Sequence, residues 1–141
     1  MSLTAPADDA TIADDTPTFT GVGAVTNGAD AEIRVEIYSG TSTTGTLVQT
    51  LTATRNSSTG AYSVTVADAA KLANGTYTAQ AEQSTVSGNT GYSPTATFVV
   101  DTAKPTITSL TGPTDPSASP SATFTFAYSD GAGSGVTAVM C

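Results

Sequence analysis

The chain has 141 residues, no histidine, a single cysteine (Cys141), four basic residues and a formal net charge of −8. The missing histidine excludes catalytic triads with a histidine base and Cys/His zinc sites within this chain. The acidic balance argues against binding to nucleic acid or anionic membranes, and no apolar run approaches the ~20 residues of a membrane span.

Apolar residues recur at every second position along the first hundred residues, which predicts β-strands rather than helices. The predicted strands cover residues 16–22, 33–37, 47–53, 62–66, 77–82 and 96–100. The side chains expected to share the inner face are Phe19, Ile33, Val35, Ile37, Leu47, Gln49, Leu51, Ala53, Tyr62, Val64, Val66, Tyr77, Ala79, Ala81, Ala96, Phe98 and Val100.

Turn residues such as Asn27-Gly28 and Asn74-Gly75 separate these runs, because asparagine and glycine tolerate positive φ. Short strands at regular spacing with turns between them indicate an antiparallel sandwich or barrel. Residues 67–72 predict one short helical turn at most. Met1-Ser2, or Met1-Ser2-Leu3, resembles a start added for expression rather than a signal peptide, and we expect it to contribute little to the fold.

The sequence changes character at residues 101–105, which are polar and end in Lys104-Pro105, as expected of a domain junction. Beyond it, residues 107–110 and 124–128 predict strands, and a last apolar run covers residues 136–140. Residues 121–125 (SATFT) echo residues 16–20 (TPTFT), which indicates the start of a second repeat. A fragment of this size cannot bury a sufficient core alone. We therefore expect residues 106–141 to be disordered, or to pair with an edge of the first domain or of another chain.

Several motifs resemble those of bacterial immunoglobulin-like (Ig-like) repeats of large surface and adhesin proteins. They are Asp15-Thr16-Pro17-Thr18-Phe19-Thr20-Gly21, Gly60-Ala61-Tyr62-Ser63-Val64, Leu72-Ala73-Asn74-Gly75-Thr76-Tyr77, Ser87-Gly88-Asn89 and Phe98-Val99-Val100-Asp101-Thr102-Ala103-Lys104-Pro105. Each is short, and their order and spacing carry the resemblance.

The resemblance implies an all-β, Ig-like antiparallel β-sandwich with Greek-key connections and about seven strands. It implies a domain over residues 3–101, followed by a linker and a truncated second repeat over residues 102–141. The implied function is a non-catalytic spacer of an extracellular or bacterial cell-surface protein. Its expected partners are neighbouring repeats of the same chain, with host or matrix glycans or proteins bound through other domains. The alternatives are a glycan- or protein-binding module, or an accessory domain of a secreted hydrolase.

The candidate chemistry is sparse, and no catalytic, cofactor-binding or metal-binding residue is assigned. Glu32 and Glu36 are expected to point outward from one strand and Glu82 from another, with no spacing that indicates a catalytic cleft. We expect no cofactor, although calcium at the interdomain linker remains an alternative, because Ca²⁺ needs six or more oxygen ligands. The acidic residues that fall in loops or junctions are Asp8, Asp9, Asp14, Asp15, Asp101 and Asp130. The other interpretation is that these residues serve turns and solvation.

Three tyrosines and the cysteine complete the candidates. Tyr38, at a strand end, and Tyr92, in a loop, are the candidates for an exposed binding patch. Tyr77 is either a tyrosine corner, with its hydroxyl bonded back to nearby backbone, or an ordinary inward aromatic residue. Cys141 is either a free thiol or the partner of a cysteine elsewhere.

Overall fold

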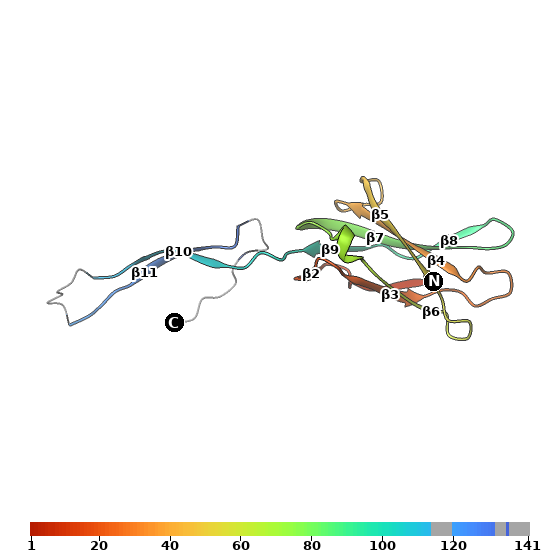
Figure 1. Cartoon of the computed structure of the whole chain (residues 1–141), viewed down its shortest axis with the longest axis horizontal. Coiled ribbons are helices and arrows are strands. Elements are labelled where there is room, and N and C mark those ends of the chain that lie inside the picture. The colour runs from red at the N-terminus through yellow and green to blue at the C-terminus, as the bar shows by residue number, and fades with distance from the viewer. Residues whose placement is uncertain (114–119, 132–134, 136–141) are drawn as a thin grey trace. The chain divides into compact units, whose positions relative to one another are not determined.

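The computed structural model describes residues 1–113, 120–131 and 135. The chain divides into two compact units, Met1–Thr102 and Ala103–Cys141 (Figure 1). The division falls within the polar segment 101–105, where the composition of the sequence changes.

Residues 1–102, all of which are described, form nine strands in two sheets. The smaller sheet has the order β1 (Ser2–Ala5), β3 (Thr18–Val22) and β6 (Ala61–Thr65). The larger has the order β2 (Ala10–Ile12), β9 (Ala96–Val100), β7 (Gly75–Ser84), β4 (Glu32–Ser39) and β5 (Leu47–Thr54), and β8 (Thr90–Tyr92) also pairs with β7. The short helical turn expected over residues 67–72 is the 3₁₀ turn η1 (Asp68–Ala70).

The core lies between the two sheets and is built by the alternation that the sequence shows. Phe19 of the smaller sheet is fully buried and meets Phe98 of the larger sheet edge-to-face, with ring centroids 5.8 Å apart. Ile33, Val35 and Ile37 are fully buried along β4, while their neighbours on the strand face outward. The predicted all-β sandwich is therefore confirmed, because period-two burial from two layers closes one interior.

Tyr77 fills both of the roles considered for it. Its ring is buried and stacks on Phe98 at a centroid distance of 5.9 Å. Its hydroxyl donates a hydrogen bond of 2.9 Å to the backbone oxygen of Ala73, four residues upstream. The tyrosine corner is confirmed, and it links the turn before β7 to the strand itself.

The expectation that the first three residues contribute little to the fold is wrong. Ser2 and Leu3 belong to β1, which pairs with β3, and Met1 and Leu3 pack against the core. The Tyr62 hydroxyl donates to the backbone oxygen of Ser2 at 2.8 Å, and burial raises the pKa of Tyr62 to about 12. Gly21 allows this approach, because a Cβ there would lie 2.1 Å from the Ser2 oxygen. The segment is structural because it covers one edge of the core.

Two further positions differ from the prediction for physical reasons. An irregularity in the β4–β5 register sets Leu47 opposite the outward-facing Tyr38, so Leu47 is 48% exposed and does not share the inner face. Tyr92 lies in β8 rather than in a loop. Between β8 and β9, the Ser93 hydroxyl accepts a hydrogen bond from the Ala81 amide at 3.0 Å. Pro94, which has no amide to donate, separates the two strands.

The second unit contains β10 (Thr106–Thr111) and β11 (Thr125–Ser129), which pair with each other in an antiparallel hairpin (Figure 1). The expectation of disorder is therefore wrong for these residues, and pairing with an edge of the first domain or of another chain stays a prediction. The two strands satisfy each other's backbone groups. The apolar run 136–140 and Cys141 lie outside the described residues.

Candidate functional site

The outward carboxylates of the larger sheet gather around one arginine. Arg34 lies opposite Glu82 in the β4–β7 register, with its Nη1 2.9 Å from Glu82 Oε1. Its Nη2 lies 3.6 Å from Glu36 Oε1. The sequence places Glu36 and Glu82 on separate strands, and the register brings both to the same cation. The two ion pairs of Arg34, with Glu36 on its own strand and with Glu82 on the neighbouring strand, are called the Arg34 ladder below. Opposite charges paired across neighbouring strands stabilise a sheet.

The two candidate tyrosines for a binding patch lie on this same outer face. Tyr92 is 59% exposed and pairs with Glu82 across the β7–β8 ladder. The Tyr38 hydroxyl donates to Glu36 Oε2. This hydrogen bond, followed by burial and by the nearby charges of Glu36, Glu82 and Tyr92, raises the pKa of Tyr38 to about 12. Tyr38 on β4 and Tyr92 on β8 therefore share the outer face of the larger sheet, a placement that their 54-residue separation in the sequence does not reveal.

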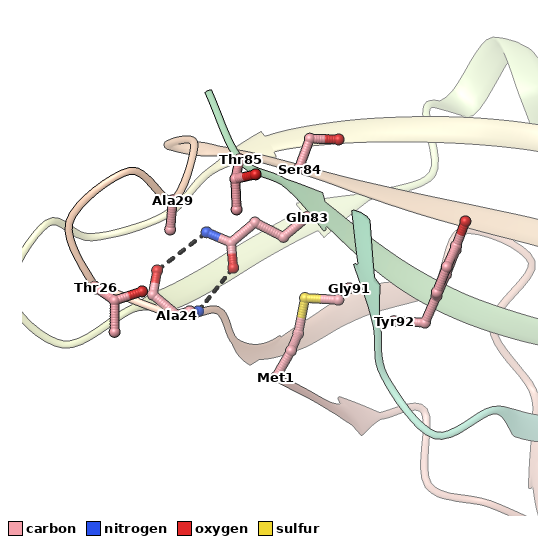
Figure 2. A pocket seen from close by; sticks show the side chains of 9 residues that line it. All are labelled: Met1, Ala24, Thr26, Ala29, Gln83, Ser84, Thr85, Gly91 and Tyr92. Atoms are coloured by element: carbon pink, nitrogen blue, oxygen red, sulfur yellow. Dashed lines mark hydrogen bonds between the residues drawn. The ribbon is translucent and has the colours of Figure 1, made fainter. Parts of the chain in front are cut away.

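A hollow of about 240 Å³ opens at the end of the sandwich where the chain begins (Figure 2). The residues that line it are Met1, Ala24, Thr26, Ala29, Gln83, Ser84, Thr85, Gly91 and Tyr92. Met1 precedes β1, Gln83 and Ser84 end β7 and Thr85 follows it, Gly91 and Tyr92 belong to β8, and the other three lie in the loop between β3 and β4. Four of the lining residues carry hydroxyl groups: Thr26, Ser84, Thr85 and Tyr92. Among the residues that line the hollow, Tyr92 has the one titratable side chain, and Met1 carries the N-terminal amino group.

Gln83 is the polar residue that shapes this hollow. It is 6% exposed and follows the inward residues of β7, so its amide points into the sandwich. Its Oε1 accepts a hydrogen bond from the Ala24 amide at 2.7 Å, and its Nε2 donates to the Ala24 oxygen at 3.0 Å (Figure 2). The same Nε2 donates to the Asp30 oxygen at 2.7 Å. Gln83 therefore holds the β3–β4 loop against β7.

Arg55 holds the same loop from the other side. Its Nε donates to the Asp30 oxygen at 3.2 Å and its Nη2 to the Ala29 oxygen at 3.1 Å. Neither Gln83 nor Arg55 was singled out in the sequence. The signal for Gln83 was its place in the period-two pattern, since residues 77, 79, 81 and 83 share one face of β7. The predicted strand ends at residue 82, one residue before Gln83.

The acidic residues considered for calcium make hydrogen bonds or ion pairs within the protein where the structure describes their contacts. Asp8 Oδ1 accepts from the Thr97 amide at 2.8 Å, and Asp14 Oδ1 accepts from the Thr16 amide at 2.8 Å. Asp15 Oδ1 lies 3.2 Å from Lys71 Nζ. Asp130 Oδ2 accepts from the Gly135 amide, and Asp9 is the one non-glycine residue with positive φ in the described chain.

Among the described residues no group of three or more histidine, cysteine, aspartate or glutamate side chains is arranged to hold a metal ion. The backbone amide of the linker residue Asp101 donates a hydrogen bond of 2.8 Å to the Ile12 oxygen. Calcium at the linker stays a prediction for solution measurement.

No helix of the described chain is long and apolar enough to cross a membrane. A family model described as a bacterial Ig-like domain matches residues 3–102, which is most of the chain. No curated protein matches the chain.

Proposed function

Because the chain belongs to the bacterial Ig-like domain family over residues 3–102, we propose that its first unit is a non-catalytic spacer in an extracellular, adhesin-type surface protein. The family supports a structural module. The spacer role, the surface location and the neighbouring repeats of the same chain as partners are our proposal.

The observation that carries this proposal is the position of the two ends of the first unit. Ser2 pairs with Val22 in β3, beside the Gly23-Ala24 segment that Gln83 holds. At the other end of β7, Gly75 pairs with Val100, the last residue of β9. The chain therefore begins at one end of β7 and leaves from the other, as Figure 1 shows for β9 and the N-terminus.

This arrangement gives each module a defined length. The strand β7 has 10 residues, and a strand rises about 3.3 Å per residue, so it spans roughly 33 Å. A spacer whose ends lie at opposite poles converts each additional copy into added reach. A module with adjacent ends would add bulk without length.

The far end of the first unit is also tied to the outgoing chain. Asn74 Oδ1 accepts hydrogen bonds from the Thr102 amide at 3.1 Å and from the Thr102 hydroxyl at 2.8 Å. Asn74 lies in the turn before β7, so the exit direction of the chain is set by the module itself. A directed exit is what a stiff array requires, because a free linker would let the modules fold back on each other.

The second unit supports a following copy. Ser2-Leu3-Thr4-Ala5-Pro6 is repeated as Ser109-Leu110-Thr111-Gly112-Pro113, and Thr18-Phe19-Thr20 as Thr123-Phe124-Thr125. The strand pairing repeats as well. Leu3 lies opposite Gly21 in β1–β3, and the corresponding Leu110 lies opposite Phe126 in β10–β11. We propose that residues 102–141 contain the opening strands of a second repeat.

A tandem chimera tests the spacer proposal. Residues 2–102 are attached after residue 108, so that Ser2 takes the place of its counterpart Ser109. Small-angle X-ray scattering of the chimera and of residues 1–102 should show the maximum dimension increasing by roughly 30–40 Å per added module, from the strand rise. Two modules that lie side by side, with an increase of only about one sheet spacing of ~10 Å, would contradict the spacer role.

A second candidate function, glycan or protein binding, is favoured by one observation: Tyr38 and Tyr92 lie on the outer sheet face that carries the Arg34 ion pairs. Exposed rings beside hydrogen-bonding groups are a common feature of sugar-binding surfaces. A glycan-array screen of the chain against a Tyr38→Ala/Tyr92→Ala double variant tests it. Signals that are equal for both proteins, or absent for both, would count against this function.

A further inference from the structure

The β10–β11 hairpin has one apolar face and one polar face. The large residues of the apolar face are Ile107, Leu110, Phe124, Phe126 and Tyr128, with exposed fractions of 64, 67, 61, 37 and 49%. The paired positions on the other face hold only threonine, serine and alanine: Thr106 opposite Ser129, Ser109 opposite Ala127, and Thr111 opposite Thr125. Clean alternation of this kind belongs to a sheet with one face buried and one in water.

The side chains of the apolar face already lie against one another. The Phe126 and Tyr128 ring centroids are 6.3 Å apart. Phe124 lies over Gly112, where a Cβ would meet the ring at 2.7 Å. The face is therefore a continuous layer of rings and aliphatic groups, with Lys104 and Asp130 outside the paired strands.

The corresponding strands of the first unit show what such a face requires. Phe19, the counterpart of Phe124, is fully buried because the larger sheet covers it. Leu3, the counterpart of Leu110, packs against the same core. In the hairpin both positions are more than 60% exposed. An isolated two-stranded hairpin is marginal in water, and a second layer stabilises it.

The first unit has no exposed apolar surface that matches the apolar face of the hairpin. Its apolar side chains lie between its own sheets, and its outward strand faces carry the Arg34 ladder and threonine. The large apolar residues that it exposes are spread over separate elements: Val22 in β3, Leu47 and Val48 in β5, Tyr92 in β8, and Val25 and Val86 in loops. Within the described chain, the surface that matches the hairpin in extent and chemistry is the same face of a second copy.

The area is sufficient for a weak, specific contact. Each aromatic ring buries roughly 150–250 Å² when fully covered. Covering the exposed parts of three rings and two aliphatic side chains on both copies removes on the order of 1,000 Å² from water, which is near the lower limit of specific interfaces. Two hairpins packed face to face form a two-layer, four-stranded sandwich of the kind seen in the first unit. A contact of this kind would be isologous and would close as a dimer.

We propose that this chain self-associates through the apolar face of β10–β11, with a second copy of the same hairpin as its partner. This proposal rests on the exposed face and not on the spacer function, so either can fail alone.

The test is sedimentation velocity over a micromolar to sub-millimolar concentration series, in a Cys141→Ser background that prevents disulfide-linked dimers. We expect the mass to rise with concentration from 14.0 kDa toward twice that value. A Phe124→Ser/Phe126→Ser variant should weaken association at least about tenfold, because it removes the central ring, Phe126, and the 61% exposed ring of Phe124 at one end of the face. The matched control, Thr125→Ser/Ala127→Ser, changes the opposite face and should associate like the parent chain.

The melting temperature of the first unit is a control for folding that is independent of self-association. It should be the same in all of these variants, because the core lies within residues 1–102. Residues 1–102 alone should be monomeric. A monomeric full chain across the series would overturn the proposal, since another segment would then have to cover the face. Dimers that persist in the double-serine variant, or that are lost equally in the control, would overturn it as well.

Discussion

The inward glutamine of β7 allows a sharp test of how the β3–β4 loop is held. Gln83→Met keeps the length of the side chain and removes its amide. The Ala24 amide and oxygen then lose their partner, while the Asp30 oxygen keeps the hydrogen bond from Arg55 Nε. Three hydrogen bonds at about 1 kcal/mol each, in a site that is 6% exposed, predict a loss of about 3 kcal/mol in the free energy of unfolding. In a domain of this size that lowers the melting temperature by roughly 10–20 °C.

Gln49 provides the matched control on β5. Its Oε1 is buried and has no hydrogen-bond partner. Gln49→Met is the same chemical change at another inward position, and it removes an unsatisfied acceptor instead of three bonds. We expect it to leave stability unchanged or to raise it by up to about 1 kcal/mol.

Urea unfolding of residues 1–102 in the parent, Gln83→Met and Gln49→Met forms measures both effects at a common m value. Amide hydrogen exchange should show loss of protection at Ala24 in Gln83→Met alone. The reasoning is refuted if the two variants are equally destabilised, or if Gln83→Met lies within about 0.5 kcal/mol of the parent, which is the range of ordinary surface substitutions.

Three further outcomes follow from the same geometry. Gly21→Ala should cost about 2–4 kcal/mol in urea unfolding, because its Cβ would lie 2.1 Å from the Ser2 oxygen; Gly91→Ala, where the nearest atom is 4.0 Å away, is the control and should change little. Tyr62 is stabilised as the neutral phenol, so its contribution is complete below pH 10 and is lost as the pH rises to about 12; the alkaline loss of stability should be smaller in Tyr62→Phe. Calcium should leave the melting temperature where EDTA leaves it, and a rise with Ca²⁺ that Asp101→Asn abolishes would instead place the ion at the linker.

The strands that could be predicted are those in which alternation runs over five or more residues. Ile33, Val35 and Ile37 alternate with charged residues, so their burial follows from period alone. The strands β1, β2 and β8 have only three or four residues and carry little alternation. They exist because tertiary pairing supplies what the local pattern lacks, as β2 shows by pairing in parallel with β9.

The candidate site could not be predicted because it depends on the register between strands, which is not apparent from the amino-acid sequence. The Arg34–Glu82 ion pair requires the β4–β7 register, and a shift of one residue would separate the two side chains onto opposite faces. Leu47 was assigned inward because the sequence does not show the irregularity beside Tyr38. Gln83 is an inward position of β7 by the two-residue period, but its side chain is polar where the other inward residues are mostly apolar. Its hydrogen-bond partner Ala24 belongs to a loop nearly 60 residues earlier, which the local sequence does not reveal.

The parallel pairing of β2 with β9 has a mechanical consequence. The N-terminus precedes β2 and the outgoing chain follows β9, so tension along an array pulls these two neighbours in opposite directions along their length. The backbone hydrogen bonds along the paired segments 10–12 and 98–100 are then all loaded in shear at the same time. A load shared in this way must break the bonds at once, whereas strands pulled apart from one end would open bond by bond.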